Sequence, residues 1–159
     1  MKFEKLLQIG IVTDNVEASV AQFKNFGFEN WTEMPFESRF IPGMTLNGEP
    51  SDLRFNGAMY SDGNLEIELI EPVSESVFMD WLREHGPGIH HLALKPVGDF
   101  DDFMAEYKAM GYEPLIEVLD GTKTRGFTYL DTFKSLGFFT EIHKGAPGNP
   151  DECKQEEQA

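Results

Sequence analysis

The stretch VEASVAQFKNFGFE, residues 16–29, occurs a second time as FDDFMAEYKAMGYE, residues 100–113, and the two copies align without a gap. Four positions are identical, and others exchange one large apolar side chain for another. Both copies carry apolar residues at the spacing of an amphipathic helix. Each helix is followed by a glycine, Gly27 or Gly111, which suits the left-handed position after a helix end. The repeat therefore predicts two like halves, each built around one helix.

The segments around the repeat extend this pattern to most of the chain. A short apolar strand precedes each helix, LLQIGIV from Leu6 and HHLALKP from His90, and one extra residue in the second copy aligns Gln8 with His91. Residues 35–52 are rich in proline and glycine, which predicts a long loop. The predicted order is strand 6–12, helix 16–26, strands 28–34, 53–60 and 65–71, a linker helix 75–85, strand 89–95, helix 99–111, and strands 112–119, 125–131 and 136–143.

This order predicts an α+β fold in which two tandem βαβββ modules form a curved mixed sheet around a central cleft. Module one covers residues 3–71, the linker helix lies within 72–88, and module two covers 89–144, so that the domain spans 1–144. From Gly145 onward the chain contains glycine, proline and charged residues but no aromatic residue. Residues 145–159 are therefore predicted to be a disordered tail.

Charge and composition exclude several classes of partner. The formal net charge of −15 argues against nucleic acids and anionic membranes, which bind basic surfaces. The lone Cys153 excludes an intramolecular disulfide and fits a reducing compartment. No apolar run approaches a membrane span, and the first ten residues lack the apolar region of a signal peptide. We therefore expect a cytoplasmic protein.

Two polar residues in each half lie on strands where a packed sheet would favour apolar side chains. Gln8 aligns with His91, and IELIEP aligns with TEIHKG, which pairs Glu68 with Glu141. If the first and last strands of each half are neighbours, all four side chains project into one cleft. Any one of them alone would fit an ordinary solvated strand position. Their joint placement at repeat-equivalent positions predicts a metal site.

Alternation along each strand selects between neighbouring candidates. His91 falls on the face that corresponds to Gln8, whereas His90 is expected to point to the opposite, helix-packed side. The same argument favours Glu68 over Glu71 and leaves Glu66 as a rival. His91 and Glu68 are therefore the predicted ligands from these two strands.

One imidazole and three oxygen donors form a site that suits a divalent ion such as Zn²⁺, Ni²⁺, Co²⁺ or Mn²⁺. A bound ion of this kind polarises a carbonyl group and stabilises the enolate that forms when the neighbouring proton is removed. A ligand carboxylate is well placed to carry that proton. His143 shares a strand face with Glu141 and is expected beside it.

These motifs resemble the vicinal oxygen chelate superfamily, the glyoxalase and bleomycin-resistance fold, over residues 3–144. LLQIGIV is similar to its opening strand, IELIEP to its mid-chain strand, GPGIHHLAL to the first strand of its second half, and FTYLDT with LGFFTEIH to its closing strands. The resemblance implies that the metal ligands are Gln8, Glu68, His91 and Glu141 and that Glu141 is the base. It also implies a small-molecule substrate and a homodimer.

Within the superfamily, IELIEP and GPGIHHLAL are most similar to methylmalonyl-CoA epimerases, whereas a ligand set that includes Gln8 is similar to glyoxalase I of the human type. The first likeness implies an isomerase or epimerase, for which Glu49 in the predicted loop is the candidate second acid/base group. The second implies a lactoylglutathione lyase. A non-catalytic small-molecule binding protein of the same fold is a further alternative, as is an extradiol dioxygenase, which would need a histidine at Gln8.

Overall fold

The computed structural model describes residues 2–63 and 65–145, so the predicted tail lies outside the described residues except for Gly145. The repeat forms helices α1 (Val16–Asn25) and α3 (Phe100–Ala109), which begin after Asn15 and Asp99. The side chains of these two capping residues accept hydrogen bonds from backbone N–H groups of the first turn. The linker helix is α2 (Val77–His85), and a short α4 (Phe133–Leu136) precedes the last strand. None of the helices in the described ranges is long and apolar enough to cross a membrane.

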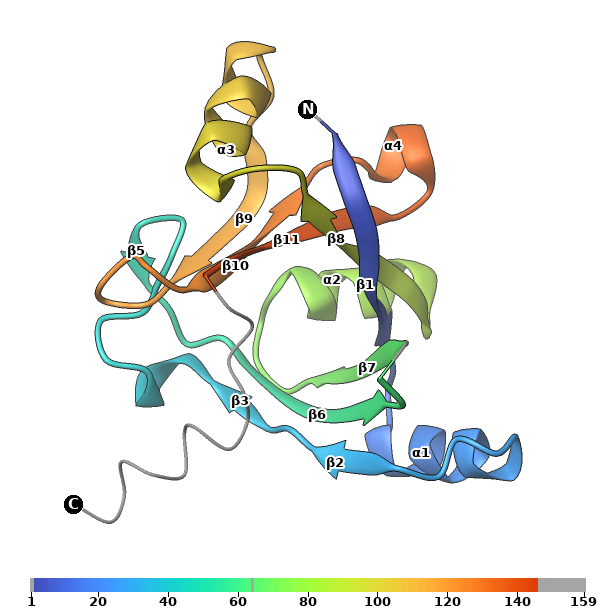
Figure 1. The fold of residues 1–159 in the computed structure, drawn as a ribbon. Helices are drawn as coiled ribbons and strands as arrows, with labels where there is room; N and C mark the ends of the chain where they lie inside the picture. The colour runs from blue at the N-terminus through green and yellow to red at the C-terminus, as the bar shows by residue number, and fades with distance from the viewer. Residues whose placement is uncertain (1, 64, 146–159) are drawn as a thin grey trace, which may run out of the picture.

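The strands form one curved mixed sheet that does not close (Figure 1). Their order across the sheet is β2-β6-β7-β1-β8-β11-β10-β9-β4-β5, and β3 pairs with β6. The predicted α+β class and the curved mixed sheet are therefore confirmed. The strands are β1 (Phe3–Val12), β2 (Trp31–Glu33), β3 (Phe36–Glu37), β4 (Thr45–Leu46), β5 (Glu49–Pro50), β6 (Arg54–Ser61), β7 (Glu66–Pro72), β8 (Gly88–Pro96), β9 (Pro114–Leu119), β10 (Gly126–Leu130) and β11 (Phe139–Lys144).

The strand register reproduces the symmetry of the repeat. In each half the first and last strands pair in parallel, β1 with β7 and β8 with β11. The two halves join where β1 and β8 pair antiparallel. Gly10 lies opposite Glu68, and the equivalent Ala93 lies opposite Glu141. The alignment of Gln8 with His91 and of Glu68 with Glu141 therefore matches the register of the sheet.

The segment 35–52 is more ordered than the loop predicted from its prolines and glycines. It contains β3, a 3₁₀ turn (Ser38–Phe40) and the β4–β5 hairpin. The hairpin turns at Asn47 and Gly48, both with positive φ, as an Asn-Gly hairpin requires. Strand β4 pairs with β9 of the second half, and Asn47 also exchanges hydrogen bonds with Glu117. The β4–β5 hairpin therefore extends the edge of the sheet next to β9, while β3 pairs with β6.

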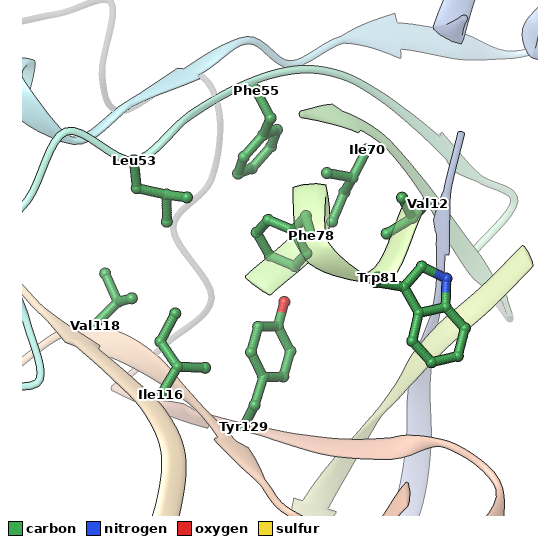
Figure 2. Packing of buried hydrophobic residues seen from close by; sticks show 9 residues of the cluster. All are labelled: Val12, Leu53, Phe55, Ile70, Phe78, Trp81, Ile116, Val118 and Tyr129. Atoms are coloured by element: carbon green, nitrogen blue, oxygen red, sulfur yellow. The ribbon is translucent and has the colours of Figure 1, made fainter. Parts of the chain in front are cut away.

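Helix α2 fills much of the space that the curved sheet encloses. Its Phe78 packs between Phe55 of the first half and Tyr129 of the second (Figure 2), and its Trp81 packs against Phe133 and Phe139. On the other face of the second half, Tyr107 and its neighbours on α3 pack against Leu130 and Ile142 of the sheet. The linker helix therefore contacts both halves of the sheet, and α3 covers the other face of the second half.

Candidate metal centre

Three of the four predicted ligands meet in the buried interior of the sheet. His91 Nε2 lies 3.1 Å from Glu141 Oε2 and 3.4 Å from Glu68 Oε2. One ligand atom from each residue lies within 4.8 Å of the others. The residues are 0%, 4% and 8% exposed for His91, Glu141 and Glu68 respectively. The side chains that the repeat paired thus converge on one point from β7, β8 and β11.

The backbone of β1 makes room for this convergence at Gly10. Gly10 is the cross-strand partner of His91, and the imidazole ring lies directly over it. A Cβ atom at this position would fall 1.9 Å from Cε1 of the ring and 2.1 Å from Nε2. A glycine inside a strand often marks such a close approach. Gly10 is therefore a structural requirement for the position of His91.

The donor atoms fit a divalent cation. His91 Nε2 and Glu141 Oε2 face each other at ion-pair distance, yet neither makes a well-directed hydrogen bond within the described part of the chain. Buried polar atoms without partners are rare and call for an explanation. A cation between one imidazole and two carboxylates would satisfy both atoms. Glu68, His91 and Glu141 could hold such an ion.

The electrostatics of the metal-free group depend on the same three residues. Burial alone would lower the pKa of His91, but the charges of Glu141 and Glu68 outweigh it and raise the pKa to about 9. Burial raises the pKa of Glu68. Burial would also raise the pKa of Glu141, but the charges of His91 and His143 lower it. A positive charge on His91 would therefore be balanced within the group by Glu141 and Glu68.

Glu141 has two further neighbours. His143 Nε2 lies 3.3 Å from Glu141 Oε1, so the two oxygens of this carboxylate face different imidazoles. Tyr129 lies directly across the strand pair from Glu141, and its ring centroid is 4.8 Å from that of His91. Burial, followed by the charge of Glu141, raises the pKa of Tyr129, so its hydroxyl stays neutral. The expected place of His143 beside Glu141 agrees with this arrangement, whereas Tyr129 was not anticipated as a site residue.

Gln8, the fourth predicted ligand, is buried on the same face of β1 as Gly10. Its Nε2 lies 3.5 Å from Met59 Sδ. Met59 is the cross-strand partner of Glu68, as Tyr129 is of Glu141. A side-chain amide that directs its nitrogen to a thioether keeps its oxygen free to bind a metal. Gln8 thus contacts the residue that lies across the strand pair from Glu68.

The other acidic candidates lie elsewhere. Glu66 is exposed at the start of β7, and Glu71 accepts a hydrogen bond from Val16 N at the beginning of α1. Glu49, the predicted second acid/base group, is exposed on β5 at the far edge of the sheet. The structure does not bring Glu49 to the buried carboxylates, because the hairpin that carries it pairs with β9.

The predicted separation of His90 from His91 is wrong. Gly10 and Ile11 are adjacent on β1, but their partners His91 and Ile89 are two residues apart, so His90 is the extra residue of a β-bulge. The bulge interrupts the alternation, and His90 Nδ1 lies 3.1 Å from His91 Nδ1. His90 was expected on a helix-packed side and does contact Phe78 and Trp81 of α2, but its ring also contacts the ring of His91.

Comparison with known proteins agrees with the fold. The profile of the Glyoxalase/Bleomycin resistance protein/Dioxygenase superfamily matches residues 7–129. A variant of Streptomyces coelicolor methylmalonyl-CoA epimerase in complex with 2-nitronate-propionyl-CoA superimposes with a TM-score of 0.64 at 24% identity, over 92% of this chain and 100% of that chain. The methylmalonyl-CoA epimerase from Mycobacterium tuberculosis gives a TM-score of 0.60 at 18% identity, over 91% and 90% of the two chains. Among curated proteins, no sequence matches significantly.

Proposed function

Because the chain belongs to the Glyoxalase/Bleomycin resistance protein/Dioxygenase superfamily, we propose that it is a metal-dependent isomerase or epimerase that removes a proton next to a carbonyl or thioester group. The observation that carries the proposal is the buried convergence of Glu68, His91 and Glu141 within 4.8 Å. Such a cluster is costly to bury unless it binds a cation or reacts.

Glu68, His91 and Glu141, with the amide oxygen of Gln8, would hold a divalent ion such as Zn²⁺, Ni²⁺, Co²⁺ or Mn²⁺. The ion would supply positive charge to the substrate oxygen, on which negative charge develops as the proton leaves. Glu141 is the base: its carboxylate accepts the proton, and the electrons of the broken C–H bond form the enolate C=C bond. His143 and Tyr129 hold Glu141 in position for this transfer.

Glu68 is the group that would return the proton. Epimerisation needs an acid on the side of the enolate opposite the base, and Glu49 does not lie in the site. The pKa of Glu68 is raised by burial, whereas the charges of His91 and His143 lower that of Glu141. Two carboxyl groups whose pKa values are pushed apart in this way suit an acid and a base respectively. Glu68 is the other carboxyl group of the cluster, and it would fill this role in place of Glu49 while it is protonated and not bound to the ion.

The proposed substrate is a small acyl thioester of the methylmalonyl-CoA type. The support is the fold shared with epimerases, one of which is in complex with 2-nitronate-propionyl-CoA. The buried Gln8 supports a second candidate, a glyoxalase I-like lyase that acts on a hemithioacetal. A non-catalytic binding protein is disfavoured because nothing in simple ligand binding requires a buried carboxylate pair. A homodimer and a cytoplasmic location stay predictions from the sequence.

Metal content and proton exchange test this function. Protein purified without added metal should contain a divalent ion or bind Co²⁺ or Ni²⁺ stoichiometrically, and less than about a tenth of an equivalent with no rebinding would contradict the proposal. With methylmalonyl-CoA in deuterated water, the wild type should exchange the α-proton, and Glu141→Gln should not. Glu66→Gln, an exposed glutamate on the same strand as Glu68, is the control that should exchange normally. If the protein exchanges the proton of a hemithioacetal but not the α-proton of methylmalonyl-CoA, it is the lyase.

A further inference from the structure

We infer that His90 is a positioning residue that fixes the proton of His91 on Nδ1 and so presents Nε2 to the metal. This inference rests on the proposed metal centre. It concerns a contact between two adjacent side chains that strict strand alternation would keep apart.

The contact exists because of the bulge in β8. His90 and His91 are both fully buried, and their Nδ1 atoms are 3.1 Å apart. Two nitrogen atoms at this distance share one proton, since one must donate and the other accept. If His91 uses Nε2 as a metal ligand, its proton must lie on Nδ1. His90 Nδ1 is then the acceptor.

The surroundings of His90 suit an acceptor that never becomes charged. Its ring lies among aromatic rings, with centroids 4.9 Å from Phe139, 5.2 Å from Phe78 and from Trp81, and 5.5 Å from Tyr129. A neutral His90 carries one proton, and with Nδ1 accepting, that proton lies on Nε2.

His90 Nε2 has no hydrogen-bond partner among the described residues. Aromatic rings therefore surround His90, and among the residues that the structure describes, the contact to His91 is the only directed polar contact of its side chain. Most metal-bound histidines donate their second N–H to a carboxylate, a carbonyl or water. A neutral imidazole in this place fixes the tautomer without adding negative charge behind the ligand.

Substitutions that move the acceptor atom test this role. Asparagine places a polar atom near the position of Nδ1, whereas glutamine places it near Nε2, and leucine has none. His90→Asn should keep most of the affinity for Co²⁺, and His90→Gln and His90→Leu should each lose about 10- to 100-fold in competition titrations with a chelator. Equal affinities for His90→Leu and the wild type would overturn the inference.

Nitrogen NMR tests the hydrogen bond without reference to activity. In the ¹⁵N-histidine-labelled, metal-free wild type, a scalar coupling across the hydrogen bond should join the two Nδ1 nuclei, with the proton attached to His91. A proton found on His90 Nδ1 in the Zn²⁺-loaded protein would refute the assignment. If the protein binds no metal, the proposed function is wrong. The coupling in the metal-free protein would still show whether His90 accepts a hydrogen bond from His91.

Discussion

Replacing Gly10 with alanine should weaken metal binding, although Gly10 is not itself a ligand. The new Cβ would lie 1.9 Å from the His91 ring, whereas ordinary contact begins at 3.4 Å, so the ring must retreat by about 1.5 Å. Metal–ligand distances tolerate only about 0.2 Å. The retreat would also withdraw the imidazolium from two buried carboxylates. We expect Co²⁺ affinity to fall by at least about 100-fold, and the metal-free protein to lose about 2–4 kcal/mol of unfolding free energy.

Gly88→Ala is the matched control for this substitution. Gly88 also lies on a paired strand, but a Cβ there would meet no atom within 4 Å. It should bind metal normally, and its unfolding free energy should change by less than about 1 kcal/mol, because alanine only restricts the unfolded chain. Urea unfolding and chelator competition measure both variants. Wild-type affinity and stability in Gly10→Ala would refute the placement of the His91 ring over β1.

Three other perturbations probe the same region. Because the pKa of His91 in the metal-free protein is about 9, Zn²⁺ must displace a proton, and the Zn²⁺ affinity should rise about tenfold per pH unit from about pH 6 to 8. Calorimetry in buffers of different ionisation enthalpy counts the protons released. An affinity that does not change with pH would contradict the ion pair. Phe78→Ala should cost about 3–5 kcal/mol in urea unfolding because Phe78 is 1% exposed, whereas Phe26→Ala, 81% exposed, should cost less than about 0.5 kcal/mol. Tyr129→Phe keeps the ring beside His91 but removes the hydroxyl near Glu141, so it should lower the free energy of unfolding by about 1–3 kcal/mol. Unchanged stability in thermal unfolding would show that the hydroxyl does not support Glu141.

The repeat predicted a curved mixed sheet in which the first and last strands of each half pair, because it constrains equivalent strands together. Once Gln8 aligns with His91, the antiparallel pairing of β1 with β8 follows the approximate twofold symmetry, and so do the parallel pairs in each half. The hairpin in residues 35–52 could not be predicted in this way. Its two-residue strands are too short to show periodicity, and β4 is stabilised by pairing with β9, which is distant in sequence.

The errors inside the site arise from local departures from ideal strands. Strand alternation predicted that His90 and His91 point to opposite faces, but a bulge brings their side chains together, and no residue type in this part of the sequence predicts that bulge. The sheet register equates Met59 with Tyr129, since these are the partners of Glu68 and Glu141. Gly10 was the available signal for the crowded centre, because a glycine in a strand often marks close approach.

The two halves differ chemically at equivalent positions, and this difference gives the two carboxyl groups unlike surroundings. His91 and His143 both come from the second half, and their equivalents in the first half are Gln8 and the buried Ile70, which carry no charge. Glu141 therefore lies against two imidazoles, which keep it ionised.

The surroundings of Glu68 favour a proton instead. It contacts only one of these imidazoles, and its cross-strand partner is the thioether of Met59. Burial consequently dominates its pKa and raises it. The symmetric backbone brings the two carboxyl groups together, and the unequal placement of histidines gives them opposite pKa shifts, as the proposed roles of base and acid require.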